Sequence, residues 1–210
     1  MDAIIKCMNI HKQYGKNEVL VDFNANVEKG SFTTISGKSG CGKSTLMNII
    51  GLLDTSDKGR VLFYDDREVN PFTREASRFL RHNIGYLFQN FALVDEESVE
   101  YNLLIAISHV KKRKRKGMIH EALKRVGLEG FEHKKIYQCS GGEQQRIAIA
   151  RLLLKECDII LADEPTGSLD EENKWIILNL LKELQNIGKT ILVVTHDPEV
   201  MEIADFNIRM

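Results

Sequence analysis

The chain has 210 residues, of which 43% are hydrophobic and 28% are charged, a composition typical of a globular protein. The 29 Lys and Arg residues nearly balance the 30 Asp and Glu residues, and the net charge of -1 gives no general indication of a nucleic-acid partner. No apolar stretch reaches the roughly 18 residues needed to cross a bilayer, and residues 1–12 lack a signal-peptide pattern, so we expect a cytosolic chain.

Short apolar segments alternate with helical patterns along the chain, which predicts a parallel sheet covered by helices on both faces. The first 36 residues are rich in β-formers, with strands expected at Val19–Val27 and Phe32–Ser36. Further strands are expected at Gly59–Tyr64, Ile84–Phe88, Asp158–Ala162, Thr190–Val194 and Phe206–Met210. Helices are expected at Lys43–Leu53, at Glu171–Ile187, which Gly188 ends, and at Pro198–Ala204.

A long segment without strand signals separates two of the expected strands. Ser98–Lys155 has the pattern of several helices, and the stretch from Phe88 to Asp158 is too long for one crossover connection. We therefore expect a single α/β domain over residues 1–210, with a helical subdomain inserted at approximately residues 90–157.

Six consecutive basic residues, Lys111–Lys116, fall within this helical segment. Three interpretations remain open: a solvated helix end or loop, contact with anionic lipid headgroups, and contact with nucleic acid. The rest of the chain offers no aromatic or basic surface that would extend a nucleic-acid site, so we expect no nucleic-acid partner.

The cysteines argue against a metal site or a disulfide framework. Cys7, Cys41, Cys139 and Cys157 form no CxxC pair and have no His neighbours at metal-ligand spacing. Reduced thiols in the cytosol account for them most simply.

Residues 37–45, with the sequence GKSGCGKST, match the phosphate-binding pattern G-x-x-x-x-G-K-[ST]. The pattern follows an expected strand and opens an expected helix, so backbone N–H groups can point at phosphate oxygens beside a positive helix end. We expect Lys43 to reach the β- and γ-phosphates, Ser44 to ligate Mg²⁺ and Thr45 to hold the α-phosphate. The full set of candidate phosphate-binding residues is Gly37, Lys38, Ser39, Gly40, Cys41, Gly42, Lys43, Ser44 and Thr45.

Polar side chains follow three other apolar strands, and ligands bind beyond the carboxyl ends of open parallel sheets. Asp163 follows one strand, as expected for a carboxylate that holds Mg²⁺ through water, and Glu164 follows it, where it can polarise an attacking water. Gln89 and His196 end two more strands. Each is weak evidence alone, but their shared placement makes both candidates for the same site.

A second glycine-rich helix start lies at Ser140–Gly142, before the apolar-periodic segment Ile147–Leu154. It has the physical properties of an anion site for the same reason as residues 37–45. One ATP does not need two such sites from one chain. Two chains placed head to tail would give each ATP one site from each chain.

These motifs together resemble the ABC ATPases. Cys139–Arg146 is similar to the LSGGQ signature, with Cys139 in the usual Leu position, and Asp163–Asp170 is similar to the Walker B motif plus the D-loop. Thr195–Asp197 resembles the H-loop and Gln89 the Q-loop, while Tyr14 occupies the position of an aromatic that stacks on adenine. The resemblance covers essentially the whole chain.

This resemblance implies an α/β P-loop NTPase core with a mostly parallel sheet, an antiparallel β portion and an inserted helical subdomain. It implies ATP hydrolysis with Mg²⁺, in an ATP-dependent homodimer attached to a transmembrane permease on the cytoplasmic face of the membrane. The implied catalytic residues are Lys43, Gln89, Glu164 and His196, and the implied metal ligands are Ser44, Gln89 and Asp163. The implied nucleotide contacts also include Tyr14, Ser140, Gly141, Gly142 and Asp170.

Three segments have sequences similar to those of the macrolide-exporter, lipoprotein-releasing and bacteriocin-exporting group: Thr166–Asp170, Gly51–Asp54 and Gly85–Gln89. That similarity implies export of a peptide, bacteriocin, antibiotic or lipoprotein by a separate permease. Two alternatives remain open: a subunit of a small-solute importer, and an ATPase that signals through a membrane partner without carrying cargo.

Overall fold

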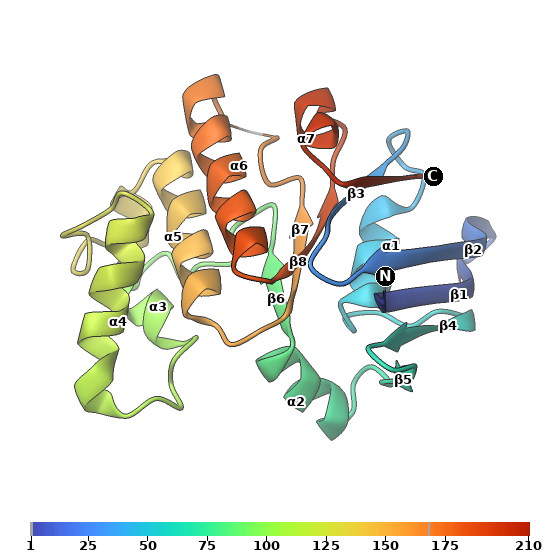
Figure 1. Cartoon of the computed structure of the whole chain (residues 1–210), viewed down its shortest axis with the longest axis horizontal. Helices are drawn as coiled ribbons and strands as arrows, with labels where there is room; N and C mark the ends of the chain where they lie inside the picture. Colours follow the sequence, from blue (N-terminus) through green and yellow to red (C-terminus); the bar gives the residue numbers. More distant parts are fainter. Residues whose placement is uncertain (1, 168) are drawn as a thin grey trace.

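The computed structural model describes residues 2–167 and 169–210. A five-stranded sheet with the strand order β6-β7-β8-β3-β9 forms its centre, and all of its strands pair in parallel (Figure 1). These strands are β3 (Phe32–Ser36), β6 (Ile84–Leu87), β7 (Ile159–Asp163), β8 (Thr190–Val194) and β9 (Phe206–Arg209). Parallel pairing brings all five carboxyl ends to one edge of the sheet, as the alternating pattern predicted.

A second, antiparallel sheet has the order β2-β1-β4-β5 and confirms the expected antiparallel portion. Its strands are β1 (Ala3–Tyr14), β2 (Asn17–Glu28), β4 (Lys58–Phe63) and β5 (Arg67–Glu68). The first two strands form a long hairpin. Its turn contains Gly15, whose φ of 62° lies in the left-handed region that glycine tolerates.

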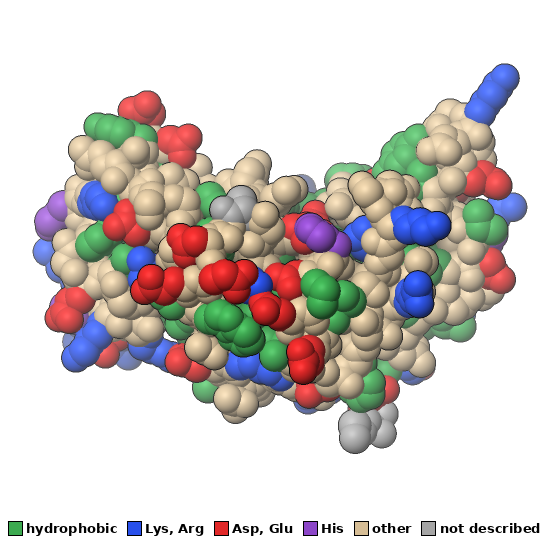
Figure 2. Space-filling view, turned by 90° about the horizontal axis from the view of Figure 1, so that it is seen from above, with side chains coloured by type: hydrophobic (Ala, Val, Ile, Leu, Met, Phe, Trp, Pro, Cys, Tyr) green, Lys and Arg blue, Asp and Glu red, His purple; other side chains and the backbone are tan. Residues whose placement is uncertain are grey.

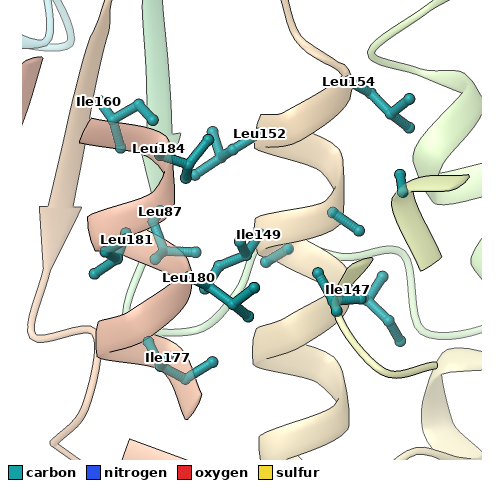
Figure 3. Close-up of a cluster of buried hydrophobic side chains, with 14 of the residues drawn as sticks. Leu87, Ile147, Ile149, Leu152, Leu154, Ile160, Ile177, Leu180, Leu181 and Leu184 are labelled. Carbon is teal, nitrogen blue, oxygen red and sulfur yellow. The ribbon is translucent and has the colours of Figure 1, made fainter. Parts of the chain in front are cut away.

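Alternate residues of the central strands face two separate hydrophobic clusters, because side chains in a strand point to opposite faces in turn. Ile160 and Val193 face one cluster, which they share with the helices α5 and α6 (Figure 3). Leu161 and Leu192 face the other, which contains residues of the helix α1 and of the antiparallel sheet. The sheet is therefore buried on both sides, which explains the continuous apolar runs in its sequence.

Several helices lie between β6 and β7 in the chain, as predicted for this segment. They are α3 (Val99–Leu104), α4 (Lys112–Arg125), the short 3-10 helix η1 (Ile136–Gln138) and α5 (Gly141–Leu154). The other helices are α1 (Lys43–Ile50), α2 (Arg74–His82), α6 (Glu171–Asn186) and α7 (Pro198–Glu202). Within residues 2–167 and 169–210, none of the helices is both long and apolar enough to span a bilayer.

Two predicted helix ends were wrong by more than one residue, and one of them is that of the helix expected at Pro198–Ala204, since α7 ends at Glu202. The helix that begins at Lys43 was expected to reach Leu53, but α1 ends at Ile50 with Gly51 as its C-cap. Leu52 then takes a left-handed φ of 57°, which no α-helix can continue. Leu52 still packs inward, with only 3% of its surface exposed, so the apolar pattern continues past the end of the helix.

Leu181 lies fully buried between α6 and the central sheet, in the cluster of Figure 3. We expect Leu181→Ala to lower the free energy of unfolding by about 2–5 kcal/mol, because it removes packed atoms and leaves a cavity. Urea unfolding followed by circular dichroism measures the change. Ile187→Ala is the control, since Ile187 is 58% exposed, and it should change stability by less than about 0.5 kcal/mol. Equal effects of the two substitutions would contradict the packing described here.

Candidate functional site

A cavity of about 360 Å³ opens at the carboxyl edge of the central sheet. Its lining combines the end of β1, the loop before α1 and the residues that end β6, β7 and β8. The lining residues are Tyr14, Val19, Ser39, Gly40, Gly42, Lys43, Ser44, Thr45, Gln89, Asp163, Glu164 and Val194. Most of the site residues expected from the sequence are thus brought to one place.

The loop before α1 depends on glycine at position 42. Gly42 has a φ of 98° and is the N-cap of α1. A Cβ atom there would lie 2.8 Å from Val19 Cγ1 and 2.9 Å from the Val19 carbonyl oxygen, both too close for any side chain. The glycine therefore lets the loop pack against β2 while its backbone turns into the helix.

Lys43 lies on the inner side of this loop. Its Nζ donates hydrogen bonds to the carbonyl oxygens of Gly37 at 2.9 Å and of Lys38 at 3.0 Å, and it lies 4.0 Å from Cys41 Sγ. The ammonium is therefore held beside the backbone curl that the phosphate pattern predicted. Gly37, Lys38 and Cys41 shape the loop but do not line the cavity.

Two adjacent carboxylates stand opposite the loop. Asp163 ends β7, and it lines the cavity together with Ser44. Burial raises the pKa of the Asp163 carboxyl above its ordinary value, and the negative charge of Glu164 adds to this rise. Among the described residues, Asp163 Oδ1 and Glu164 Oε2 are buried without a hydrogen-bond partner.

The unpartnered oxygen of Asp163 suits a hard cation such as Mg²⁺, because a buried carboxylate oxygen is costly unless something satisfies it. Ser44 and Asp163 are the residues that could hold the ion. No cluster of three His, Cys, Asp or Glu side chains that could hold a metal occurs in residues 2–167 and 169–210. A cation here would therefore need further ligands from water or phosphate, which is how Mg²⁺ binds in most nucleotide sites.

Glu164 has an unusual backbone, with a φ of 46° in the left-handed region. Its N–H donates to the Val194 carbonyl at 2.9 Å, and its Oε1 accepts a hydrogen bond from His196 Nδ1 at 2.8 Å. Conformational strain of this kind persists only where surrounding bonds enforce it, and it concentrates at functional sites. The structure thus joins the two strand-end residues Glu164 and His196, although His196 does not line the cavity.

Tyr14 lies at the rim of the cavity with half of its surface exposed. Its hydroxyl donates to Asp54 Oδ2 at 2.5 Å, and Lys12 Nζ donates to Asp54 Oδ1 at 2.8 Å. The hydrogen bond to Asp54 raises the pKa of the Tyr14 hydroxyl. Asp54 and Lys12, which fix the ring, were missed in the sequence, since no local pattern links residues so far apart.

Ser140, Gly141, Gly142 and Asp170 do not line this cavity, so the single chain does not bring them to the other site residues. Ser140 is the N-cap of α5 and forms a capping box with Glu143, while Asp170 is the N-cap of α6. A Cβ on Gly141 would meet nothing within 4 Å, so the backbone there is open to an incoming group.

The two helix starts lie side by side. A Cβ on Gly142 would lie 2.6 Å from Asn173 Oδ1, and the Asn173 side chain also donates to Asp170. Within the predicted D-loop, Ser168 lies outside the described residues.

Comparison with known proteins identifies the family. Residues 20–167 match the family model of the ABC transporters. The chain is 39% identical over 209 residues to the macrolide export ATP-binding/permease protein MacB of Mannheimia succiniciproducens, covering 96% of this chain and 32% of that protein. It is also 39% identical over 215 residues to the ABC transporter ATP-binding protein MJ1508 of Methanocaldococcus jannaschii, covering 99% and 95% of the two chains. The chain therefore spans about a third of the macrolide-export relatives and nearly all of the other.

Solved structures agree with this assignment. The dimeric structure of MJ0796, an ABC transporter cassette, superposes with a TM-score of 0.88 at 37% identity, covering 98% of this chain and 94% of that chain. A post-hydrolysis state of the same cassette, bound to ADP and phosphate, superposes equally well at 38% identity. The chain belongs to the ABC transporter family, as an ATP-binding and ATP-hydrolysing cassette.

Proposed function

We propose that this cassette drives a membrane permease that exports a peptide, bacteriocin, antibiotic or lipoprotein. The observation that carries the proposal is the match to macrolide-export proteins over 96% of the chain. Those relatives join an ATP-binding part, to which this chain corresponds, with a permease part. The cassette would then be held at the cytoplasmic face of the membrane through the permease alone.

In this proposal ATP enters the cavity with its adenine on the Tyr14 ring and its phosphates in the loop 37–45. Lys43 faces the β- and γ-phosphates, where a charge-assisted bond stabilises the anion. Ser44 and Asp163, with Gln89 nearby, would hold Mg²⁺, which supplies neutralisation of the phosphate charge. The buried, unpartnered oxygen of Asp163 supports this role.

Glu164 would orient and polarise the water that attacks the γ-phosphorus, so that the bond to the bridging oxygen breaks and ADP and phosphate leave. The hydrogen bond from His196 to Glu164 Oε1 leaves Oε2 free to accept from that water. The left-handed backbone of Glu164 aims its side chain into the cavity that Lys43 and Ser44 also line.

We also propose that two chains enclose each ATP. Ser140–Gly142 and Asp170 lie outside the cavity of their own chain and would contact the nucleotide held by a second copy. The exposed backbone at Gly141 and the positive end of α5 support this arrangement. The related cassette MJ0796 is dimeric in its solved structure.

Glu164→Gln tests both parts of this mechanism. The substitution keeps the size of the side chain and removes its basicity, so ATP should bind while turnover falls by about two to four orders of magnitude. Analytical ultracentrifugation should show a monomer without nucleotide, a dimer with ATP and a monomer with ADP, since ADP lacks the bridging γ-phosphate. Glu68→Gln, an exposed change on β5, is the matched control and should behave as the wild type.

Two results would count against the mechanism. Full ATPase activity of Glu164→Gln would remove the catalytic role of Glu164. A variant that stays monomeric at saturating ATP, with or without the permease, would remove the two-chain arrangement.

The permease contact is proposed at a groove of about 620 Å³ between α2, β6 and α5. Its wall is connected to the ATP site, because Arg151 of α5 donates to the carbonyl oxygens of Phe91 and Ala92, two and three residues after Gln89. The lining residues are Ser77, Leu80, Arg81, Tyr86, Phe88, Ala92, Ile105, Ala106, Ser108, Arg151, Leu152 and Lys155.

Ile105→Asp should break the permease contact and leave the ATP site untouched, since it places a charge in an exposed apolar position of the groove. The expected result is unchanged ATPase activity of the isolated chain and loss of co-purification with its permease. Ile187→Asp, on an equally exposed isoleucine at the end of α6, is the control. Normal co-purification of Ile105→Asp would refute the groove assignment, and transport assays with that permease in vesicles separate export from import.

A further inference from the structure

Lys174, in the first turns of α6, is a lysine with only 7% of its surface exposed. Its Nζ lies 3.0 Å from Glu171 Oε1 and 3.4 Å from Asp197 Oδ2, and it also pairs with Glu199. The carboxylates of Glu199 and Glu171 raise the pKa of Lys174, so it is charged at any physiological pH. One buried cation thus holds the first turn of α6 against the first turn of α7.

Asp197 and Glu199 belong to the segment that directly follows His196. Asp197 is the N-cap of α7: its Oδ1 accepts from the Glu199 N–H at 2.9 Å, and its other oxygen faces Lys174. The Asp197 N–H in turn donates to Thr195 Oγ1 at 3.0 Å. Asp197, the residue that directly follows His196, therefore connects the backbone at this point to the Lys174 side chain.

The start of α6 is itself tied to the elements around the ATP site. Asp170 caps the helix by accepting from the Asn173 N–H at 2.8 Å, and Asn173 lies against Gly142 of α5. From α5, the buried Gln145 Nε2 donates to the Pro165 carbonyl at 2.8 Å, one residue after Glu164. The first turn of α6, which carries Lys174, is thus connected through α5 to the chain that follows Glu164. Through Lys174 it is also connected to the chain that follows His196.

We propose that Lys174 is a positioning residue that holds His196 against Glu164 by joining the first turns of α6 and α7. The proposal rests on the hydrolytic role proposed above for Glu164 and His196. Without the ammonium, the carboxylates of Glu171, Asp197 and Glu199 face one another with no compensating charge, and their repulsion separates the two turns. Figure 2, which looks onto the face from which α6 and α7 begin, shows acidic side chains gathered there.

The first test compares Lys174→Met with Lys182→Met. Lys182 lies on the same helix and is partly buried, and its ammonium contacts Gln185 and the Phe32 ring and no carboxylate among the described residues. We expect Lys174→Met to lower kcat about ten- to hundredfold, as a misplaced catalytic group does, and to leave KM for ATP within about twofold, since Lys43 still binds the phosphates. Lys182→Met should change neither constant, and Lys174→Arg should restore most of kcat.

Stability is measured first, and the rates are taken well below the unfolding midpoint of every variant. Should Lys174→Met fail to fold, Glu199→Gln takes its place, because it weakens the same contact from α7 and should lower kcat severalfold without changing KM. Unchanged kcat in whichever of these variants folds would overturn the proposal, as would a rise in KM that matches the fall in kcat.

The second test asks whether Lys174 acts through His196. Groups that act as one unit are not additive, so single-turnover hydrolysis by His196→Ala and by His196→Ala/Lys174→Met should agree within about twofold. A further tenfold loss in the double variant would refute the positioning role and leave the proposed mechanism intact. Full activity of His196→Ala would instead remove the proposed role of His196, and the positioning role of Lys174 with it.

Discussion

The ATP site depends on the parallel alignment of β3, β6, β7 and β8. Their register pairs Leu87 with Ala162, and Asp163 with Val194, so the residues that follow each strand emerge at one edge. Burial of both faces of the sheet fixes this register, because a slip of one residue would turn buried side chains to the wrong face. The phosphate loop, Gln89, Glu164 and His196 meet only because four apolar strands stop at the same level.

Charged side chains are concentrated at the carboxyl ends of these strands, close to the first turns of several helices. Asp163 and Glu164 are adjacent carboxylates with buried oxygens, opposite Lys43 and beside the Ser44 hydroxyl. The left-handed backbone of Glu164 is stabilised by its hydrogen bonds to β8 and to His196. The α5 helix and the first turn of α6 connect this region to the second glycine-rich helix start. A motion of α5 relative to the central sheet would therefore act on the loops that carry Glu164 and His196, the proposed catalytic groups.

The central strands and the phosphate loop could be predicted from the sequence, because their signals are local: short apolar runs, a glycine pattern and carboxylates at strand ends. The α2 helix was missed since it has only nine residues, most of them charged or polar, and buries only Ala76 and Phe79. Asp54 and Lys174 could not be found either. Tyr14 lies 40 residues from Asp54, and Asp197 and Glu199 lie outside the helix that carries Lys174, so only the tertiary fold brings these partners together.

The central claim is that each ATP is held by two chains, one through Lys43 and the other through the helix start at Gly141. Mixing two inactive variants measures it directly: Lys43→Ala loses the first contact, and Gly141→Arg places bulk in open space at the second without disturbing the fold. A mixed dimer contains one site with both contacts intact, so the mixture should recover up to about a quarter of wild-type ATPase activity under random pairing of a symmetric dimer. A mixture no more active than the two variants measured separately would contradict the account.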